Sequence, residues 1–121
     1  MRVIGARPKE EAMCELASKK CVPCRGGTAA LAGDAITSLL KRIDGWEVVN
    51  ERHLSREFKF ADFATALAFV NRVGEIAEAE AHHPDIALSW GKVGIRIWTH
   101  KIDGLTESDF ILAAKIDALT L

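Results

Sequence analysis

The sequence predicts an α+β domain with the element order α-β-β-α-β-β-α, in which helices cover one face of a four-stranded antiparallel sheet. Three observations predict this class. Strand-like runs occur as two pairs with short connections, which favours antiparallel hairpins. Apolar residues recur at helical spacing before, between and after those pairs. The chain of 121 residues corresponds to one domain, since roughly 150 residues is a typical domain length.

The first half of the domain begins with a helix predicted over residues 35–43, for which Asp34 is the expected cap. Two strands follow, over residues 46–50 and 54–60. The second of these alternates between apolar and polar side chains, as a strand with one buried face does. The short connection between the two strands predicts a hairpin.

The long helix predicted over residues 62–81 has two apolar stripes. The first stripe consists of Phe63, Leu67, Val70, Gly74, Ala77 and Ala81. The second stripe consists of Ala66, Phe69, Val73 and Ile76. Together they are wider than one contact with a sheet requires. We therefore expect a second copy of the chain to cover the second stripe, so that Val73→Glu would weaken self-association.

Pro84 ends this helix, because proline lacks a backbone donor and disfavours the α conformation at the residue before it. Strands are predicted over residues 86–90 and 93–99, joined by a tight turn. Along the latter strand, odd-numbered residues share one face and even-numbered residues share the other. The run from Thr106 to Asp109 resembles a capping box and begins the last helix.

Composition excludes several classes of protein. Hydrophobic residues make up 49% of the chain and the net charge is −1, which excludes a disordered chain and gives no basic field for nucleic acid. No apolar run approaches the roughly 20 residues that span a membrane. Since no export signal is evident either, we expect a cytoplasmic protein. A segment rich in glycine and proline separates a leader, residues 1–33, from the domain, residues 34–121.

The leader contains three cysteines, Cys14, Cys21 and Cys24. The last two have a C-x-x-C spacing that occurs in metal sites and redox motifs. A structural zinc site needs four ligands, however, and no second pair of cysteines is present. We interpret the cysteines as ordinary reduced thiols, with a metal or redox role as the alternative.

Three histidines lie where predicted elements end: His82 and His83 close the long helix, and His100 follows the fourth strand. A metal site is one interpretation, although adjacent histidines chelate poorly and no H-E-x-x-H motif is present. Another interpretation is that these histidines lie on exposed turns and have no function. The fourth histidine, His53, lies between two predicted strands and is interpreted as a surface residue.

The three histidines belong to a longer pattern. It consists of Glu78-Ala-Glu-Ala-His82-His83-Pro84, Trp90, Trp98-Thr99-His100, Gly104-Leu105-Thr106 and Asp109. In this order and spacing, the pattern resembles the signature of the pterin-4a-carbinolamine dehydratases. The resemblance covers residues 34–121, and the fold of that family has the element order derived above.

The resemblance implies an enzyme that dehydrates 4a-hydroxytetrahydropterin to quinonoid dihydropterin, with no metal and no redox cofactor. Imidazole suits the two proton transfers because its ordinary pKa of about 6.5 lets it donate or accept near neutrality. By resemblance, His82, His83 and His100 line the substrate pocket. We assign His82 and His100 to the two proton transfers and His83 to holding the hydroxyl group. Glu78 lies one helical turn before His82, so we expect it to hydrogen-bond that imidazole.

The resemblance also assigns the residues around the histidines. Trp98 and Thr99 are expected to contact the pterin ring. Ala81 occupies a substrate-contacting position that is often Asp or Asn in relatives. Trp90 and Asp109 are expected to support the site without touching substrate, the first by packing and the second at the start of the last helix.

The implied partners are the pterin substrate, further copies of the chain in a dimer or tetramer built on a central helical bundle, and the pathway of an aromatic amino-acid hydroxylase. Neither nucleic acid nor membrane is expected as a partner. Two alternative functions remain at this point. One is a non-enzymatic dimerisation cofactor on the same fold, and the other is a metal-dependent hydrolase.

Overall fold

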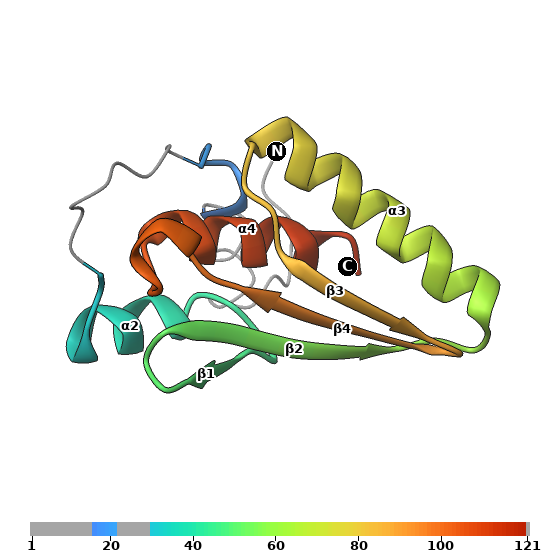
Figure 1. The fold of residues 1–121 in the computed structure, drawn as a ribbon, viewed down its shortest axis with the longest axis horizontal. Coiled ribbons are helices and arrows are strands. Elements are labelled where there is room, and N and C mark those ends of the chain that lie inside the picture. The colour runs from blue at the N-terminus through green and yellow to red at the C-terminus, as the bar shows by residue number, and fades with distance from the viewer. Residues whose placement is uncertain (1–15, 22–29, 121) are drawn as a thin grey trace, which may run out of the picture.

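The computed structural model describes residues 16–21 and 30–120 and confirms the predicted class (Figure 1). Its four strands are antiparallel and lie in the spatial order β1-β2-β4-β3. In chain order the elements are α2 (Gly33–Leu40), β1 (Glu47–Val49), β2 (His53–Lys59), α3 (Phe63–Glu80), β3 (Asp85–Ser89), β4 (Lys92–Ile97), the 3-10 turn η1 (His100–Ile102) and α4 (Glu107–Ala118).

The core lies between one face of the sheet and the helices. Helix α4 is at its centre, since residues 108–114, 116 and 117 are all buried. On β4 the predicted alternation is confirmed: Val93, Ile95 and Ile97 are buried against the helices. The other face of β4 carries the even-numbered residues and leads toward His100. Among the described residues, no helix is both long enough and apolar enough to cross a membrane.

The N-terminal caps of the first two helices differ in how they were predicted. Asp62 precedes α3, and its Oδ1 accepts a hydrogen bond from the Thr65 backbone N at 2.8 Å. The predicted cap of α2 is wrong. That helix begins one residue before Asp34, after Ala32, which makes no side-chain cap bond. Asp34 therefore lies in the first turn, where its charge still favours the helix N-terminus.

The second stripe of α3, which was expected to face another copy of the chain, instead faces the core of its own chain. The buried residues of the helix are Ala66, Phe69 and Val73 of the second stripe, together with Ala77 of the first. Phe63 and Leu67, from the other stripe, are 44% and 40% exposed. The prediction that Val73 faces a partner is therefore wrong. Because Val73 is fully buried, Val73→Glu would place an unpaired charge in the core and destabilise the chain itself.

The described part of the leader packs onto the domain instead of being loosely attached. Leu16 is fully buried in the core. Lys115 Nζ donates a hydrogen bond to the Ala17 carbonyl at 2.6 Å, and the Leu31 backbone N donates to the Leu105 carbonyl at 2.8 Å. The division into a leader of residues 1–33 and a domain of residues 34–121 stays a prediction.

Cys21 is a free, half-buried thiol. Its backbone N donates to Glu80 Oε1 at 2.8 Å. Burial, followed by the charge of Glu80, raises the pKa of the thiol to about 12. Since the thiolate is the nucleophile and the metal ligand, this environment supports the interpretation as an ordinary thiol. Cys14 and Cys24 lie outside the described residues.

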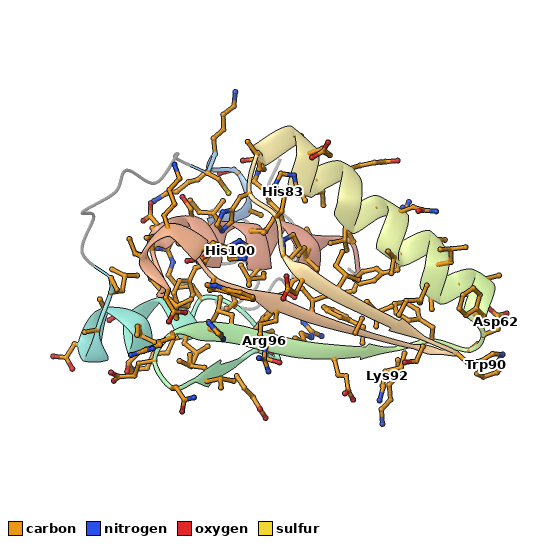
Figure 2. The ribbon with its side chains drawn as sticks, in the orientation of Figure 1. Asp62, His83, Trp90, Lys92, Arg96 and His100 are labelled. Atoms are coloured by element: carbon orange, nitrogen blue, oxygen red, sulfur yellow. The ribbon has the colours of Figure 1, made fainter. Side chains whose placement is uncertain are left out.

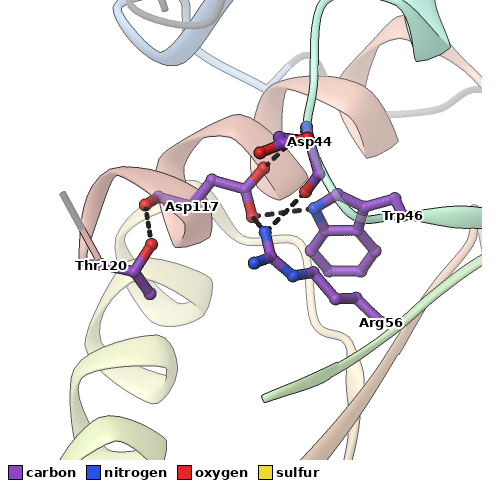
Figure 3. Close-up of polar contacts among 5 residues, drawn as sticks. All are labelled: Asp44, Trp46, Arg56, Asp117 and Thr120. Atoms are coloured by element: carbon purple, nitrogen blue, oxygen red, sulfur yellow. Dashed lines mark hydrogen bonds and ion pairs between the residues drawn. The ribbon is translucent and has the colours of Figure 1, made fainter. Parts of the chain in front are cut away.

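A buried polar cluster fastens the end of α4 to the first hairpin (Figure 3). Asp117 Oδ1 accepts hydrogen bonds from Trp46 Nε1 at 2.8 Å and Arg56 Nη1 at 2.7 Å. The Arg56 guanidinium also donates to the Asp44 carbonyl at 2.6 Å. A Cβ at Gly45 would lie 2.8 Å from Arg56 Nε, so glycine leaves the space that the guanidinium occupies.

This cluster makes stability depend on pH. Burial raises the pKa of Asp117 to about 6, against an ordinary value of 3.8, although Trp46 and Arg56 oppose the rise. Between those values the folded chain holds a proton that the unfolded chain has lost. The stabilisation is therefore complete below the lower value and declines as pH rises to the higher one, by up to roughly 3 kcal/mol. Urea unfolding should show this decline in wild type but not in Asp117→Asn, and parallel curves for the two proteins would contradict it.

Candidate active site

The end of α3 turns His82 away from the axis of the helix. Ala81 caps α3 in the left-handed conformation, with φ of 51° and ψ of 37°. The His82 backbone N then donates across the cap to the Ala77 carbonyl at 3.1 Å. Apart from glycine, Asn and Asp adopt this conformation most readily. The Asp or Asn expected at this position in relatives would thus suit the left-handed backbone, in addition to any contact with substrate.

The Asp109 carboxylate joins three segments of the site. It is fully buried, and its Oδ1 lies 2.6 Å from His82 Nε2. Its Oδ2 accepts hydrogen bonds from Thr99 Oγ1 and from the Thr106 backbone N, both at 2.8 Å. Three donors around two oxygens suit an ionised carboxylate, which can only accept. His82 and the residue before His100 therefore share one buried anion.

The predicted capping box is confirmed, because the Thr106 and Asp109 side chains each bond the other's backbone. Asp109 was predicted at this helix start, but its bond to His82 was not predicted. Motif spacing gives no sign of that bond, since the two residues are 27 positions apart. A buried carboxylate next to a histidine requires the tertiary fold to bring α4 against the end of α3.

The bond to Asp109 also fixes the chemistry of the His82 ring. With Nε2–H donating to the carboxylate, Nδ1 carries the lone pair that can accept a proton. The His82 side chain is 17% exposed, so the ring is held by protein but still reaches the surface. Such a ring is oriented by one nitrogen and available for acid–base chemistry at the other.

Glu78 contacts His83, not His82 as predicted. Its Oε2 hydrogen-bonds His83 Nε2, and the two side chains are exposed. The predicted pairing of Glu78 with His82 assumed that the helix continues to position 82. The left-handed turn at Ala81 breaks that spacing, and it leaves His83 on the side of the helix that Glu78 faces.

Trp98 contacts two imidazole rings. Its ring centroid lies 4.4 Å from that of His100 and 4.3 Å from that of His53. His100 itself is exposed at the start of η1. His53, interpreted from sequence as a surface residue, is partly exposed, with 21% of its side chain accessible, and its ring contacts Trp98 in the row of rings that ends at His100.

Two other predicted site residues, Thr99 and Trp90, do not lie as the sequence predicts. Thr99 is buried, and its hydroxyl proton is directed at Asp109. Trp90 is 71% exposed in the turn between β3 and β4. Figure 2 shows it beside Asp62, at the far end of the sheet from His83 and His100. The prediction that Trp90 packs beneath the site is wrong for this chain, because the hairpin carries that residue away from the histidines.

Within residues 16–21 and 30–120, no group of three or more His, Cys, Asp or Glu side chains is arranged to hold a metal ion. The absence of a metal from the reaction stays a prediction.

Comparison with known proteins gives a consistent set of similarities. A sequence model described as "Pterin 4 alpha carbinolamine dehydratase" matches residues 29–119. A protein of Rubrobacter xylanophilus is 58% identical over 107 residues, which are 88% of this chain and 100% of that protein. One of Alkaliphilus metalliredigens is 54% identical, over 87% of this chain and 96% of its own. Both are named "Putative pterin-4-alpha-carbinolamine dehydratase".

Two solved structures are also similar. A transcriptional coactivator/pterin dehydratase from Brucella melitensis has a TM-score of 0.71 and 33% identity, over 75% of this chain and 98% of that chain. A pterin dehydratase-like protein identified as a RuBisCO assembly factor in the alpha-carboxysome has a TM-score of 0.54 and 25% identity, over 62% of this chain and 88% of that chain.

Proposed function

The chain belongs to the pterin-4a-carbinolamine dehydratase family, and on this premise we propose that His82 and His100 carry out the proton transfers of the reaction. The protein is a dehydratase of this class, a hydro-lyase acting on a pterin. In the dehydration, the C4a–O bond breaks, N5 loses its proton, and a double bond forms between C4a and N5. One proton must therefore be removed and one delivered to the departing hydroxyl group.

One observation carries the assignment of His82 as the base: the 2.6 Å hydrogen bond between its Nε2 and Asp109 Oδ1. A carboxylate on one imidazole nitrogen stabilises the imidazolium that forms when the other nitrogen takes a proton. His82 thus removes the N5 proton through Nδ1. A positioned base of this kind typically contributes roughly 10²–10⁴-fold to the rate.

His100 delivers the second proton, to the leaving hydroxyl. Its support is the contact with Trp98 and its position next to Thr99, which shares Asp109 with His82. His83 holds the hydroxyl group, with its ring bonded to Glu78. The Trp98 ring and the backbone at Ala81 offer the flat surface and polar groups for the pterin. The hydroxylase pathway and the cytoplasmic location stay predictions.

Metal-free catalysis is the test of this function. Purified protein treated with a chelator should accelerate dehydration of enzymatically generated carbinolamine as well as untreated protein does. The reason is that both proton transfers are assigned to imidazoles. Activity that disappears with chelator and returns with zinc would refute the assignment. A folded protein without any acceleration over the spontaneous reaction would favour the alternative, a protein-binding module.

We also propose that the exposed stripe of α3 is covered by further copies of the chain, in a dimer or tetramer. Phe63 and Leu67 are the exposed members of this stripe, and Val70 and Gly74 continue it. A glycine inside a helix costs roughly 1 kcal/mol relative to alanine. Among the described residues nothing requires a glycine there, since a Cβ on Gly74 would meet none of their atoms within 4 Å. A close approach by a second helix supplies the missing reason.

Leu67→Glu should therefore reduce the mass of the assembly measured by light scattering at micromolar concentration, because it places a charge in the proposed contact. Wild type should have a mass near four chains if the family's helical bundle forms. Ala68→Glu is the matched control, since Ala68 is exposed on α3 but lies off the stripe. A wild-type protein that is monomeric across this concentration range would refute the proposed contact.

A further inference from the structure

We propose that His53 is a positioning residue for the dehydration: its ring holds Trp98 against His100 and thereby fixes the orientation of the His100 imidazole. The inference rests on the proposed role of His100 in proton transfer. It assigns a task to the one histidine that lies outside the motif carrying the family resemblance.

The sheet register brings the first two rings of this row, those of His53 and Trp98, next to each other. Leu54 of β2 pairs with Ile97 of β4. His53, which precedes Leu54 on β2, and Trp98, which directly follows β4, therefore meet on the side opposite to Leu54 and Ile97. The His53 and Trp98 ring planes are inclined by 33°, at a centroid distance of 4.3 Å. Trp98 and His100 follow at 4.4 Å, inclined by 54°.

His100 needs such support because its own backbone element is short. It begins η1, a single turn of three residues. The loop is closed at its base by the Thr99 backbone N, which donates to the Gly104 carbonyl at 2.8 Å. That bond fixes the ends of the loop but not the exposed imidazole between them. The contact with Trp98 restricts the ring directly, and displacement of a reacting group by about 1 Å can cost roughly 100-fold in rate.

His53 also reaches the far side of the same loop. Its Nε2 lies 3.3 Å from Asp103 Oδ1, and Arg52 Nη1 donates to Asp103 Oδ2 at 3.0 Å. Asp103 is 60% exposed, however, and pairs of this kind contribute little because water screens them. The ring contact with Trp98, on a side chain that is mostly buried, therefore carries the positioning.

Three variants separate the ring contact from the polar contact. His53→Ala removes both and should lower kcat about five- to tenfold, a larger effect than its effect on KM, because the ring orients His100 and has no contact of its own with the substrate. His53→Phe keeps the ring and should restore kcat to within about twofold of wild type. Arg52→Gln, which alters the Asp103 pair but leaves Trp98 untouched, should have wild-type kcat. Thermal unfolding checks that each variant is folded.

The decisive comparison repeats His53→Ala in the His100→Ala background. If His53 acts through His100, the second substitution adds no further loss. A wild-type kcat for His53→Ala overturns the inference, as does a loss that is equally large in both backgrounds or a His53→Phe variant as slow as His53→Ala. If His100→Ala itself has wild-type kcat, the proposed role of His100 is refuted. If His100→Ala is slow but His53→Ala has wild-type kcat, only the inference about His53 is refuted.

Discussion

We expect His82→Ala to slow the dehydration at least about tenfold, with His100→Ala reduced by a similar factor, because each variant removes a positioned proton-transfer group. Neither His82 nor His100 is among the buried core residues, and thermal unfolding checks that both variants are folded. The measurement is kcat with enzymatically generated carbinolamine, corrected for the spontaneous reaction.

Ser89→Ala is a suitable control, since Ser89 ends β3 and is exposed. It should retain wild-type kcat. His83→Ala should be slowed less than the other two, because His83 is assigned to holding the hydroxyl group and not to a proton transfer. An equal loss at His82, His83 and His100 would contradict the division of roles among them.

Asp109→Asn should reduce both activity and stability. The asparagine has nearly the same volume, but one of its two oxygens is replaced by a donor. At least one of the Thr99 hydroxyl, the Thr106 backbone N and the His82 ring then loses its acceptor in a buried site, which costs about 1–3 kcal/mol. Without the anion, the His82 imidazolium is no longer stabilised, so we expect kcat to fall at least about tenfold as well.

Urea unfolding and kcat measured on the same preparation separate the two effects of Asp109→Asn. Thr99→Val provides a milder comparison, because it removes one donor to the carboxylate and leaves the bond to His82 in place. It should lower stability while keeping most of the activity. A folded Asp109→Asn protein with wild-type kcat would show that Asp109 serves only as the cap of α4.

The elements of the fold were predictable because their signals are local. Alternation along β4 follows directly from the strand period, and the capping box of α4 is visible in four consecutive residues. The buried face of α3 was not predictable in the same way. Both of its stripes are apolar, and which one meets the sheet depends on the rotation of the helix against α4 and β3. That rotation is set by packing, not by the sequence of α3.

The same distinction between local and tertiary signals applies to the site. The sequence identified His82, His83 and His100 through their spacing, but it did not identify their partners. The bond between His82 and Asp109 depends on a left-handed residue at position 81, which is alanine and gives no signal in sequence. The contact between His53 and Trp98 depends on the register of β2 against β4. Contacts of this kind appear only once the strands and helices are assembled.

The most direct test of the His82–Asp109 assignment is a double-mutant cycle on kcat for carbinolamine dehydration. His82→Ala, Asp109→Asn and the double variant are compared with wild type. If the two residues act as one unit, the double variant should be no slower than the slower single variant. Losses that multiply in the double variant would show that the two residues act independently, and would contradict the assignment of Asp109 as the group that orients His82.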